Sequence, residues 1–295
     1  MKSVLARRRL TELRAQYELE PTLHDFYVEG PFDGDFFRWV AQRAGLSSTR
    51  VYQIEQVDLP RDLVAQYTDD SGNRGRVIAL GEHFCRECLH LIGRISCIVD
   101  RDGDLYDETE SWPSCVLSTN FSCLEMFCCD RGVLEKYFGL GLGLRARVAE
   151  HFWRVASGIL PEVFVIRHAR GRVQPVIRLL LFTRFLEAKG GEVHFDTEGL
   201  IERSCISSGA PDSITTLTNT AEELRRRFVG DPRYHINSHD LAEFLSWYLR
   251  NFTNKRVDSK DALRQLLPTL EYSSIADQAL IRRVIERAAA GQLGD

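Results

Sequence analysis

Residues 94–104 read RISCIVDRDGD, an apolar, β-branched run that leads directly into three alternating aspartates. The apolar part, Arg94–Val99, has the composition of a strand that is buried on both faces of a parallel sheet. Asp100, Asp102 and Asp104 follow at the end of this strand. In open α/β sheets functional groups gather at the carboxyl ends of the strands, so the three aspartates are candidate site residues.

A second stretch, residues 24–37, has a similar arrangement and reads HDFYVEG followed by PFDGDFF. His24–Gly30 is a short apolar run closed by a glycine, as expected for another buried strand, and Glu29 lies at its end. Asp33 stands where the next helix begins. The two strands can be neighbours in a parallel sheet, and their carboxyl ends would then bring Glu29 and Asp33 close to the aspartates.

The first half of the chain alternates strand and helix signals, whereas the second half is mainly helical. This order predicts an α/β fold with a parallel sheet, followed by a mainly helical domain. Further strands are predicted at residues 51–57 and 114–118. Helices are predicted at residues 77–91, 122–138, 146–160, 175–189, 238–251, 259–267 and 275–290. The glycine-rich residues 139–144 are interpreted as a hinge, which gives domains at 1–150 and 151–295.

The acidic residues at the two strand ends indicate a site for a hard divalent cation. Clustered carboxylates raise one another's pKa values, and a bound cation removes that cost. Mg²⁺ takes oxygen ligands, and Mn²⁺ suits the same ligands. Structural interpretations stay open for each residue. Asp102-Gly103 is a good turn pair, Asp33 is favoured by the helix dipole, and Glu29 could be a solvated strand end.

YVEGPFDGDFF followed by ISCIVDRDGD resembles the TOPRIM signature, in which a glutamate closes the first strand and a DxD pair closes the third. More narrowly, the chain is similar to the TOPRIM-like family formerly catalogued as a domain of unknown function. That family contains the nuclease subunits of the PARIS anti-phage systems, and the overcoming-lysogenisation-defect nucleases are more distant relatives. The resemblance implies a TOPRIM-like catalytic domain over residues 1–150. It implies catalytic roles for Glu29, Asp100 and Asp102, and metal ligands among Glu29, Asp33, Asp100, Asp102 and Asp104.

Two further segments carry the resemblance to the narrower family. STNFSCLEMF, residues 118–127, is similar to its strand-then-glutamate segment and implies that Glu125 is a metal ligand. HINSHDL, residues 235–241, is similar to an N-G-H-D-L element and makes His239 and Asp240 possible additional site residues. The alternative for Glu125 is a capping box with Ser122. The alternative for the second segment is a helix start with Ser238 as N-cap and Asp240 in the first turn.

The substrate-binding candidates are Arg167, Arg170 and Arg172, which belong to the densest basic stretch of the chain. Arginine forks suit phosphate groups. The alternative is a solvated helix face. The net charge of −4 argues against a generic nucleic-acid coat, although local patches can still bind nucleic acid.

The resemblance implies a Mg²⁺-dependent (or Mn²⁺-dependent) nuclease that acts as a toxic anti-phage effector. The expected substrate is RNA, with tRNA favoured and DNA second. The expected partners are an ABC-type ATPase that restrains the nuclease and a second copy in an active homodimer, both docked through residues 151–295. A cytoplasmic location without membrane contact is expected, because no apolar run reaches roughly 18–20 residues and the start lacks a secretory h-region.

Two other functions remain open from the residues. DxDG after a strand is also the signature of haloacid-dehalogenase-like phosphatases, in which Asp100 would be the nucleophile and Asp102 the acid/base. That motif normally lies on the first strand, and Asp104 replaces its usual Thr or Val. The other possibility is a non-catalytic regulatory subunit that keeps the TOPRIM shape to bind a partner.

Overall fold

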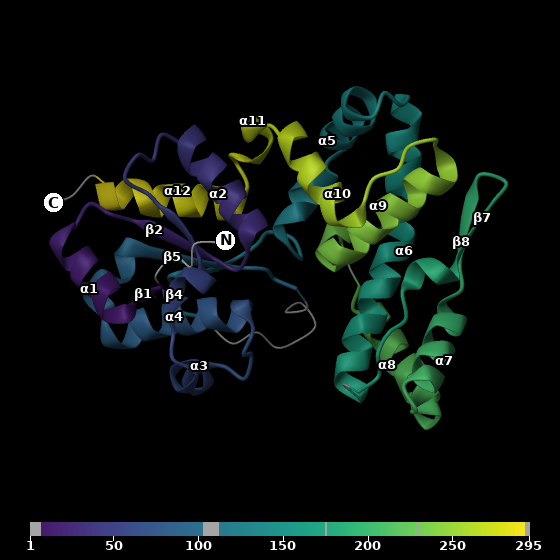
Figure 1. The fold of residues 1–295 in the computed structure, drawn as a ribbon, viewed down its shortest axis with the longest axis horizontal. Coiled ribbons are helices and arrows are strands. Elements are labelled where there is room, and N and C mark those ends of the chain that lie inside the picture. The colour runs from purple at the N-terminus through teal and green to yellow at the C-terminus, as the bar shows by residue number, and fades with distance from the viewer. Residues whose placement is uncertain (1–6, 103–111, 175, 229, 293–295) are drawn as a thin grey trace, which may run out of the picture. The chain divides into compact units, whose positions relative to one another are not determined.

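The computed structural model describes residues 7–102, 112–174, 176–228 and 230–292, and the chain divides into two units (Figure 1). Unit 1 comprises Met1–Arg101, Thr109–Asn120 and Glu271–Asp295, and unit 2 comprises Asp102–Glu108 and Phe121–Leu270. The sequence-based division at residue 150 therefore assigns residues 102–108, 121–150 and 271–295 differently. The glycine-rich residues 139–144, interpreted as a hinge, lie inside unit 2.

A four-stranded parallel sheet with strand order β3-β2-β5-β6 forms the centre of unit 1. Its strands are β2 (Asp25–Val28), β3 (Val51–Gln53), β5 (Ile95–Val99) and β6 (Val116–Ser118). Val28 of β2 pairs with Ile98 of β5, so these two strands are direct neighbours. The α/β class with a parallel sheet is thus confirmed. A second parallel pair joins β1 (Arg8–Arg9) to β4 (Val57–Asp58).

Helices cover both faces of this sheet (Figure 1). The helices of unit 1 are α1 (Leu10–Leu19), α2 (Pro31–Arg43), α3 (Arg61–Tyr67), α4 (Asn73–Glu87), α11 (Tyr272–Ile275) and α12 (Ala279–Gln292), with 3-10 turns η1 (Ile54–Gln56) and η2 (Leu89–Arg94). Successive strand residues point to opposite faces. Accordingly Phe26 packs against Phe37 of α2 at 5.9 Å between ring centroids. The neighbouring Tyr27 belongs to the core that α1, α3 and α4 complete.

The last described helix, α12, returns to the sheet of unit 1. Its Arg287 side chain donates hydrogen bonds to the carbonyl oxygens of Ile92 at 2.9 Å and Ile95 at 3.2 Å. Ile281 and Val284 on the same helix are fully buried. The chain therefore completes the first unit with its last helix, although the helix is far away in sequence.

Unit 2 is mainly helical. Its elements are η3 (Leu124–Cys129), α5 (Arg131–Lys136), the π-helical turn η4 (Tyr137–Gly141), α6 (Ala146–Val173), η5 (Phe182–Phe185), β7 (Leu186–Lys189), β8 (Glu192–Phe195), α7 (Thr197–Ser207), η6 (Pro211–Ser213), α8 (Ile214–Arg226), η7 (Pro232–His235), α9 (Ser238–Phe252), α10 (Ser259–Leu266) and η8 (Leu267–Thr269). Phe152 of α6 lies 5.2 Å from both Phe138 and Tyr248 between ring centroids, and all three rings are buried. This aromatic cluster joins α6, η4 and α9.

Two of the predicted helices are wrong. Residues 175–189 do not form a helix, because Leu186–Lys189 pairs antiparallel with Glu192–Phe195. The two-residue loop is Gly190-Gly191, and both glycines have positive φ, at 61° and 87°. A two-residue turn with positive φ at both positions matches the right-handed twist of the two strands of a hairpin. Residues 122–138 do not form one continuous helix, because the 3-10 helix η3, the short α-helix α5 and the start of the π-helical turn η4 take its place.

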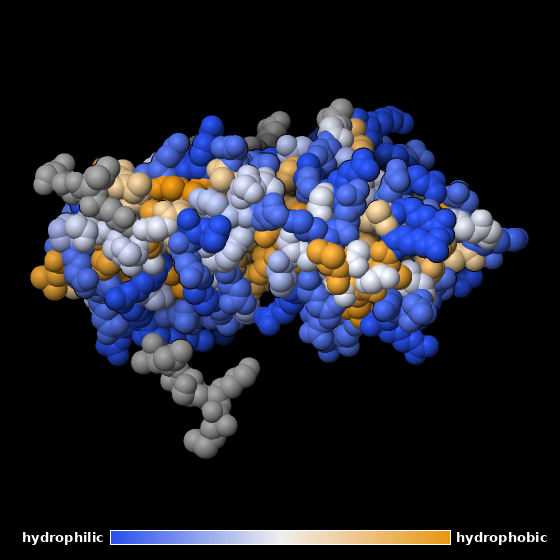
Figure 2. All heavy atoms as spheres, turned by 90° about the horizontal axis from the view of Figure 1, so that it is seen from above, coloured by the Kyte–Doolittle hydropathy of each residue, from blue (hydrophilic) through white to orange (hydrophobic). Residues whose placement is uncertain are grey.

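Among the described residues, no helix combines the length and the apolar composition that a membrane crossing requires. The face drawn in Figure 2 is mainly hydrophilic, and its hydrophobic residues form separate patches.

Candidate functional site

The carboxyl ends of β2 and β5 place two of the candidate acids in contact. Glu29 follows β2 and Asp100 follows β5, and both residues are half-buried. The backbone N–H of Asp100 donates a hydrogen bond to Glu29 Oε1 at 2.8 Å. The contact follows from the parallel register of the two strands, because their last residues meet at one edge of the sheet.

The first turn of α4 holds both strand ends from the side. Asn73 Nδ2 donates to the carbonyl oxygen of Glu29 at 2.9 Å, and Arg74 Nε donates to that of Asp100 at 3.2 Å. The Arg74 guanidinium also lies over the Trp112 ring, 5.3 Å from its centroid. Sequence reasoning missed Asn73 and Arg74 because it began this helix at Val77. The signal that could have found them is the polar, glycine-containing segment directly before that helix.

Asp33 caps the helix that follows the first candidate acid. The backbone N–H of Gly30 donates to Asp33 Oδ2 at 2.9 Å, so this carboxylate satisfies a donor at the start of α2. Asp33 therefore has the helix-terminal role that the sequence left open, and it accepts this hydrogen bond through Oδ2.

The chain after β5 is fixed by its backbone amides. The Arg101 N–H donates to Thr119 Oγ1 at 3.0 Å, and the Asp102 N–H donates to the Ser122 carbonyl at 2.8 Å. Asp102 has a φ of 44°, and it is the one non-glycine residue with positive φ in the described part of the chain. Aspartate tolerates this left-handed conformation better than most residues do, and such strain often marks functional positions. Asp104 lies outside the described residues.

Glu125 in unit 2 is the most unusual acid of the candidate set. Burial raises the pKa of its carboxyl, whereas hydrogen bonds from its own backbone amide and from Cys123 lower it. His239 also lowers this pKa, and the negative charge of Asp102 raises it. Glu125 Oε2 is buried and has no hydrogen-bond partner among the described residues. A buried carboxylate oxygen without a donor is costly, so an unsatisfied oxygen of this kind suits a ligand.

The capping box predicted as the alternative for Glu125 does not form. The backbone N–H of Ser122 donates to the carbonyl of Arg233 at 3.2 Å, and the Ser122 hydroxyl donates to the carbonyls of Arg233 and Ile236. Ser122 therefore anchors the segment before α9 and leaves Glu125 without that partner.

Asp240, a possible additional site residue, forms a buried ion pair. Both of its oxygens accept from Arg167, at 2.6 Å from Nε and 2.6 Å from Nη2. Asp240 is 1% exposed. Ser238 is not the N-cap of α9, because Asn237 accepts the His239 N–H at 2.9 Å and takes that position. His239 itself is exposed.

The three arginines proposed for substrate binding differ in their surroundings. Arg167 is engaged by Asp240, and Arg170 Nη1 donates to the Ile177 carbonyl at 3.3 Å. Arg172 is exposed near the end of α6.

In unit 1, Glu29 and Asp100 offer carboxylate oxygens, which are the ligands that a hard divalent cation takes. In unit 2, Glu125 has a buried carboxylate oxygen without a donor. Within the described residues, however, no group of three or more His, Cys, Asp or Glu side chains is arranged to hold a metal ion. Glu29, Asp33 and Asp100 belong to unit 1, while Asp102 and Glu125 belong to unit 2.

No protein-family model matches the chain, and a search of the curated proteins finds no match either. Function must therefore be inferred from the side chains and their geometry.

Proposed function

We propose that the chain is a divalent-metal-dependent nuclease with a TOPRIM-like domain around the parallel sheet of unit 1. The observation that carries the proposal is the 2.8 Å contact between Glu29 Oε1 and the backbone N–H of Asp100. It joins the glutamate after one strand to the first aspartate of the DxD pair after its parallel neighbour. That combination is the part of the sequence pattern least expected by chance.

Glu29 and Asp100 of unit 1 would hold Mg²⁺ or Mn²⁺ through carboxylate oxygens, and the family resemblance adds Asp102 as a catalytic residue. A bound ion of this kind activates water and stabilises the charge that develops during phosphodiester attack. The protein contributes orientation. The Asp100 amide fixes Glu29, and Asn73 and Arg74 hold the two strand ends through their carbonyl oxygens.

The substrate and partners are proposed from the family resemblance. RNA, with tRNA favoured, is the first substrate, and DNA is the second. The nuclease would act in the cytoplasm as a toxic anti-phage effector, as a homodimer when active, and under restraint by an ABC-type ATPase. Of the candidate substrate-binding arginines, Arg172 is exposed near the end of α6, and Arg167 is paired with Asp240.

The test is cleavage of total tRNA and of plasmid DNA by the purified protein in Mg²⁺ or Mn²⁺, with EDTA as the metal-free control. Glu29→Gln should lower the cleavage rate at least ~100-fold, since even residues that only support metal ligands cost 10–100-fold. The matched control is Asp35→Asn. Asp35 is an exposed acid on α2 whose surface pair with Arg38 is worth at most about 1 kcal/mol.

Full cleavage by Glu29→Gln would overturn the proposal, as would equal loss in Asp35→Asn. The same preparations should leave para-nitrophenyl phosphate unhydrolysed. Metal-dependent hydrolysis of this ester with intact tRNA and DNA would instead support the dehalogenase-like phosphatase, with Asp100 as its nucleophile.

A further inference from the structure

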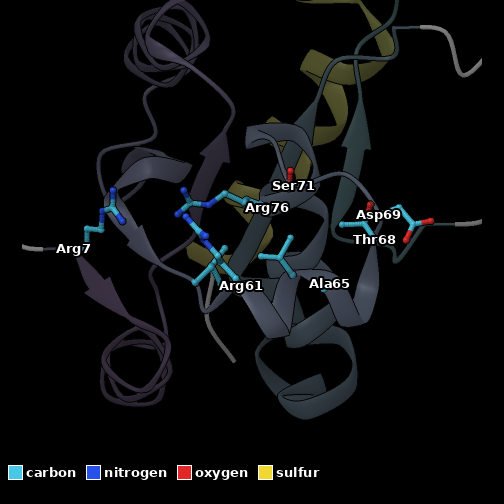
Figure 3. Close-up of a pocket in the computed structure, with 9 residues that line it drawn as sticks. Arg7, Arg61, Ala65, Thr68, Asp69, Ser71 and Arg76 are labelled. Carbon is cyan, nitrogen blue, oxygen red and sulfur yellow. The ribbon is translucent and has the colours of Figure 1, made fainter. Parts of the chain in front are cut away.

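A pocket of about 780 Å³ in unit 1 is lined by three arginines and lies outside the proposed metal site. Arg7 precedes β1, Arg61 begins α3 and Arg76 belongs to α4. The parallel pairing of β1 with β4 brings Arg7 beside the segment that leads into α3. Figure 3 shows the guanidinium groups of Arg61 and Arg76 close together, with Arg7 across the same space.

The lining of this pocket carries an excess of positive charge, with three arginines against one acid. Neither Arg7 nor Arg61 makes an ion pair or a side-chain hydrogen bond among the described residues. Asp69 is the one acid in the lining, and its side chain points away from the arginines in Figure 3. Three guanidinium groups that share one space repel one another, and a multiply charged anion would remove that repulsion.

Arg76 is held rigidly at the base of the pocket. Its Nη2 donates to the carbonyl oxygens of Val57 at 2.9 Å and Ile54 at 3.4 Å. Its Nε is buried and has no hydrogen-bond partner in the described part of the chain. Burial lowers the pKa of Arg76, and the positive charge of Arg7 lowers it further, while the negative charges of Glu55 and Asp58 act in the opposite direction. A buried donor without a partner and a neighbouring like charge both favour an anionic ligand.

The rest of the lining suits an organic group attached to that anion. Leu59, Val64 and Ala65 form an apolar wall, and Thr68 and Ser71 supply hydroxyl groups. The volume lies in the range of roughly 300–1,000 Å³ that is typical of small-molecule sites. A single carboxylate or phosphomonoester would balance only part of three positive charges. A di- or triphosphate matches the charge, and a nucleoside matches the apolar wall.

We propose that the Arg7, Arg61 and Arg76 pocket binds the di- or triphosphate group of a nucleotide. This phosphate group comes either from a free nucleotide or from the 5′-triphosphate end of an RNA. The proposal does not depend on nuclease activity, because its readout is binding.

The experiment is calorimetric titration of the full-length protein with pyrophosphate, ATP, GTP, a 5′-triphosphorylated RNA oligonucleotide and the same oligonucleotide with a 5′-hydroxyl. Pyrophosphate should bind, with an affinity that falls as salt is added. Arg7→Ala and Arg61→Ala should each weaken binding roughly tenfold or more, which is the usual size of a lost hydrogen bond between charged groups. The matched control is Arg43→Ala, since Arg43 is an exposed arginine on α2 outside the pocket.

The affinities of ATP, GTP and the triphosphorylated oligonucleotide show whether the pocket takes a free nucleotide or an RNA end. The molecule that the pocket recognises should bind more tightly than pyrophosphate does. Three results would overturn the proposal. The first is that pyrophosphate does not bind, and the second is that Arg7→Ala and Arg61→Ala leave its affinity unchanged. The third is that the 5′-hydroxyl oligonucleotide binds as tightly as the triphosphorylated one. Glu29→Gln should bind pyrophosphate normally, so failure of the nuclease proposal would leave this measurement intact.

Discussion

Disruption of the ion pair between Arg167 and Asp240 should destabilise unit 2 without changing the cleavage rate per folded molecule. The side chain of Asp240 is 2% exposed, whereas that of Arg167 is 42% exposed. Loss of one partner from a buried pair leaves an uncompensated charge and costs about 3–5 kcal/mol. Arg167→Met leaves the buried Asp240 without its partner, so we expect a loss near the lower limit, about 3 kcal/mol. Asp240→Leu should cost less, because water reaches the arginine that it leaves behind.

The double variant tests whether this cost arises from the pair. When both charges are replaced by apolar side chains, no buried charge is left behind, so the loss in the double variant should be smaller than the sum of the two single losses. A coupling free energy of at least ~1.5 kcal/mol is expected from two short hydrogen bonds. Urea denaturation followed by circular dichroism measures all four free energies of unfolding.

A second ion pair on the same helix provides the control. Arg225 binds Glu162 of α6 with a shortest distance of 2.6 Å, but both side chains are about one-third exposed, at 39% and 30%. Arg225→Met should therefore cost no more than about 1 kcal/mol. Equal losses for Arg167→Met and Arg225→Met, or strictly additive losses in the double variant, would refute the reasoning. Cleavage per folded molecule should be unchanged in Arg167→Met, because Asp240 engages the Arg167 guanidinium.

Two further predictions concern pH and backbone strain. Burial lowers the pKa of His24 from 6.5 to about 4, with Arg287 and Arg94 acting in the same direction. The folded state thus prefers the neutral ring, and roughly 3 kcal/mol of stability that is present above pH 6.5 should be lost as the pH falls toward 4. His24→Gln should flatten the dependence of Tm on pH in this window, and an unchanged slope would contradict the assignment. Asp102→Gly should keep or raise thermal stability by up to ~1–2 kcal/mol, because glycine adopts positive φ without strain, yet it should abolish cleavage. If Asp102→Gly cleaves at the wild-type rate, Asp102 is not a residue of the catalytic site.

The neighbouring strands β2 and β5 could be predicted because their signals are local. Each is a short apolar run with an acid at its end, and the side-chain pattern of a buried parallel strand does not depend on distant partners. The hairpin of β7 and β8 could not be predicted in this way. The sequence of β7, LEAK, consists of residues that favour helices, and its strand conformation is imposed by the Gly190-Gly191 turn and by pairing with β8.

The supports of the candidate site were harder to predict than its acids. Asn73 and Arg74 act through backbone carbonyls of segments that are distant in sequence, and no spacing rule connects a helix start to those atoms. Arg287 of α12 is a similar case, since it reaches the carbonyls of Ile92 and Ile95 only in the folded chain. A motif identifies side chains that carry the chemistry, whereas the side chains that position them emerge from tertiary structure.

The first turns of α4 connect the two proposed sites. Asn73 and Arg74 hold the strand ends at Glu29 and Asp100, and Arg76, further along the same helix, lines the arginine pocket. Arg76 is therefore a poor choice for mutation, because its replacement would alter both sites at once. Arg61 contacts neither strand end among the described residues. A change in cleavage caused by nucleotide in the wild type, but absent in Arg61→Ala, would show that the pocket acts on the site through this helix.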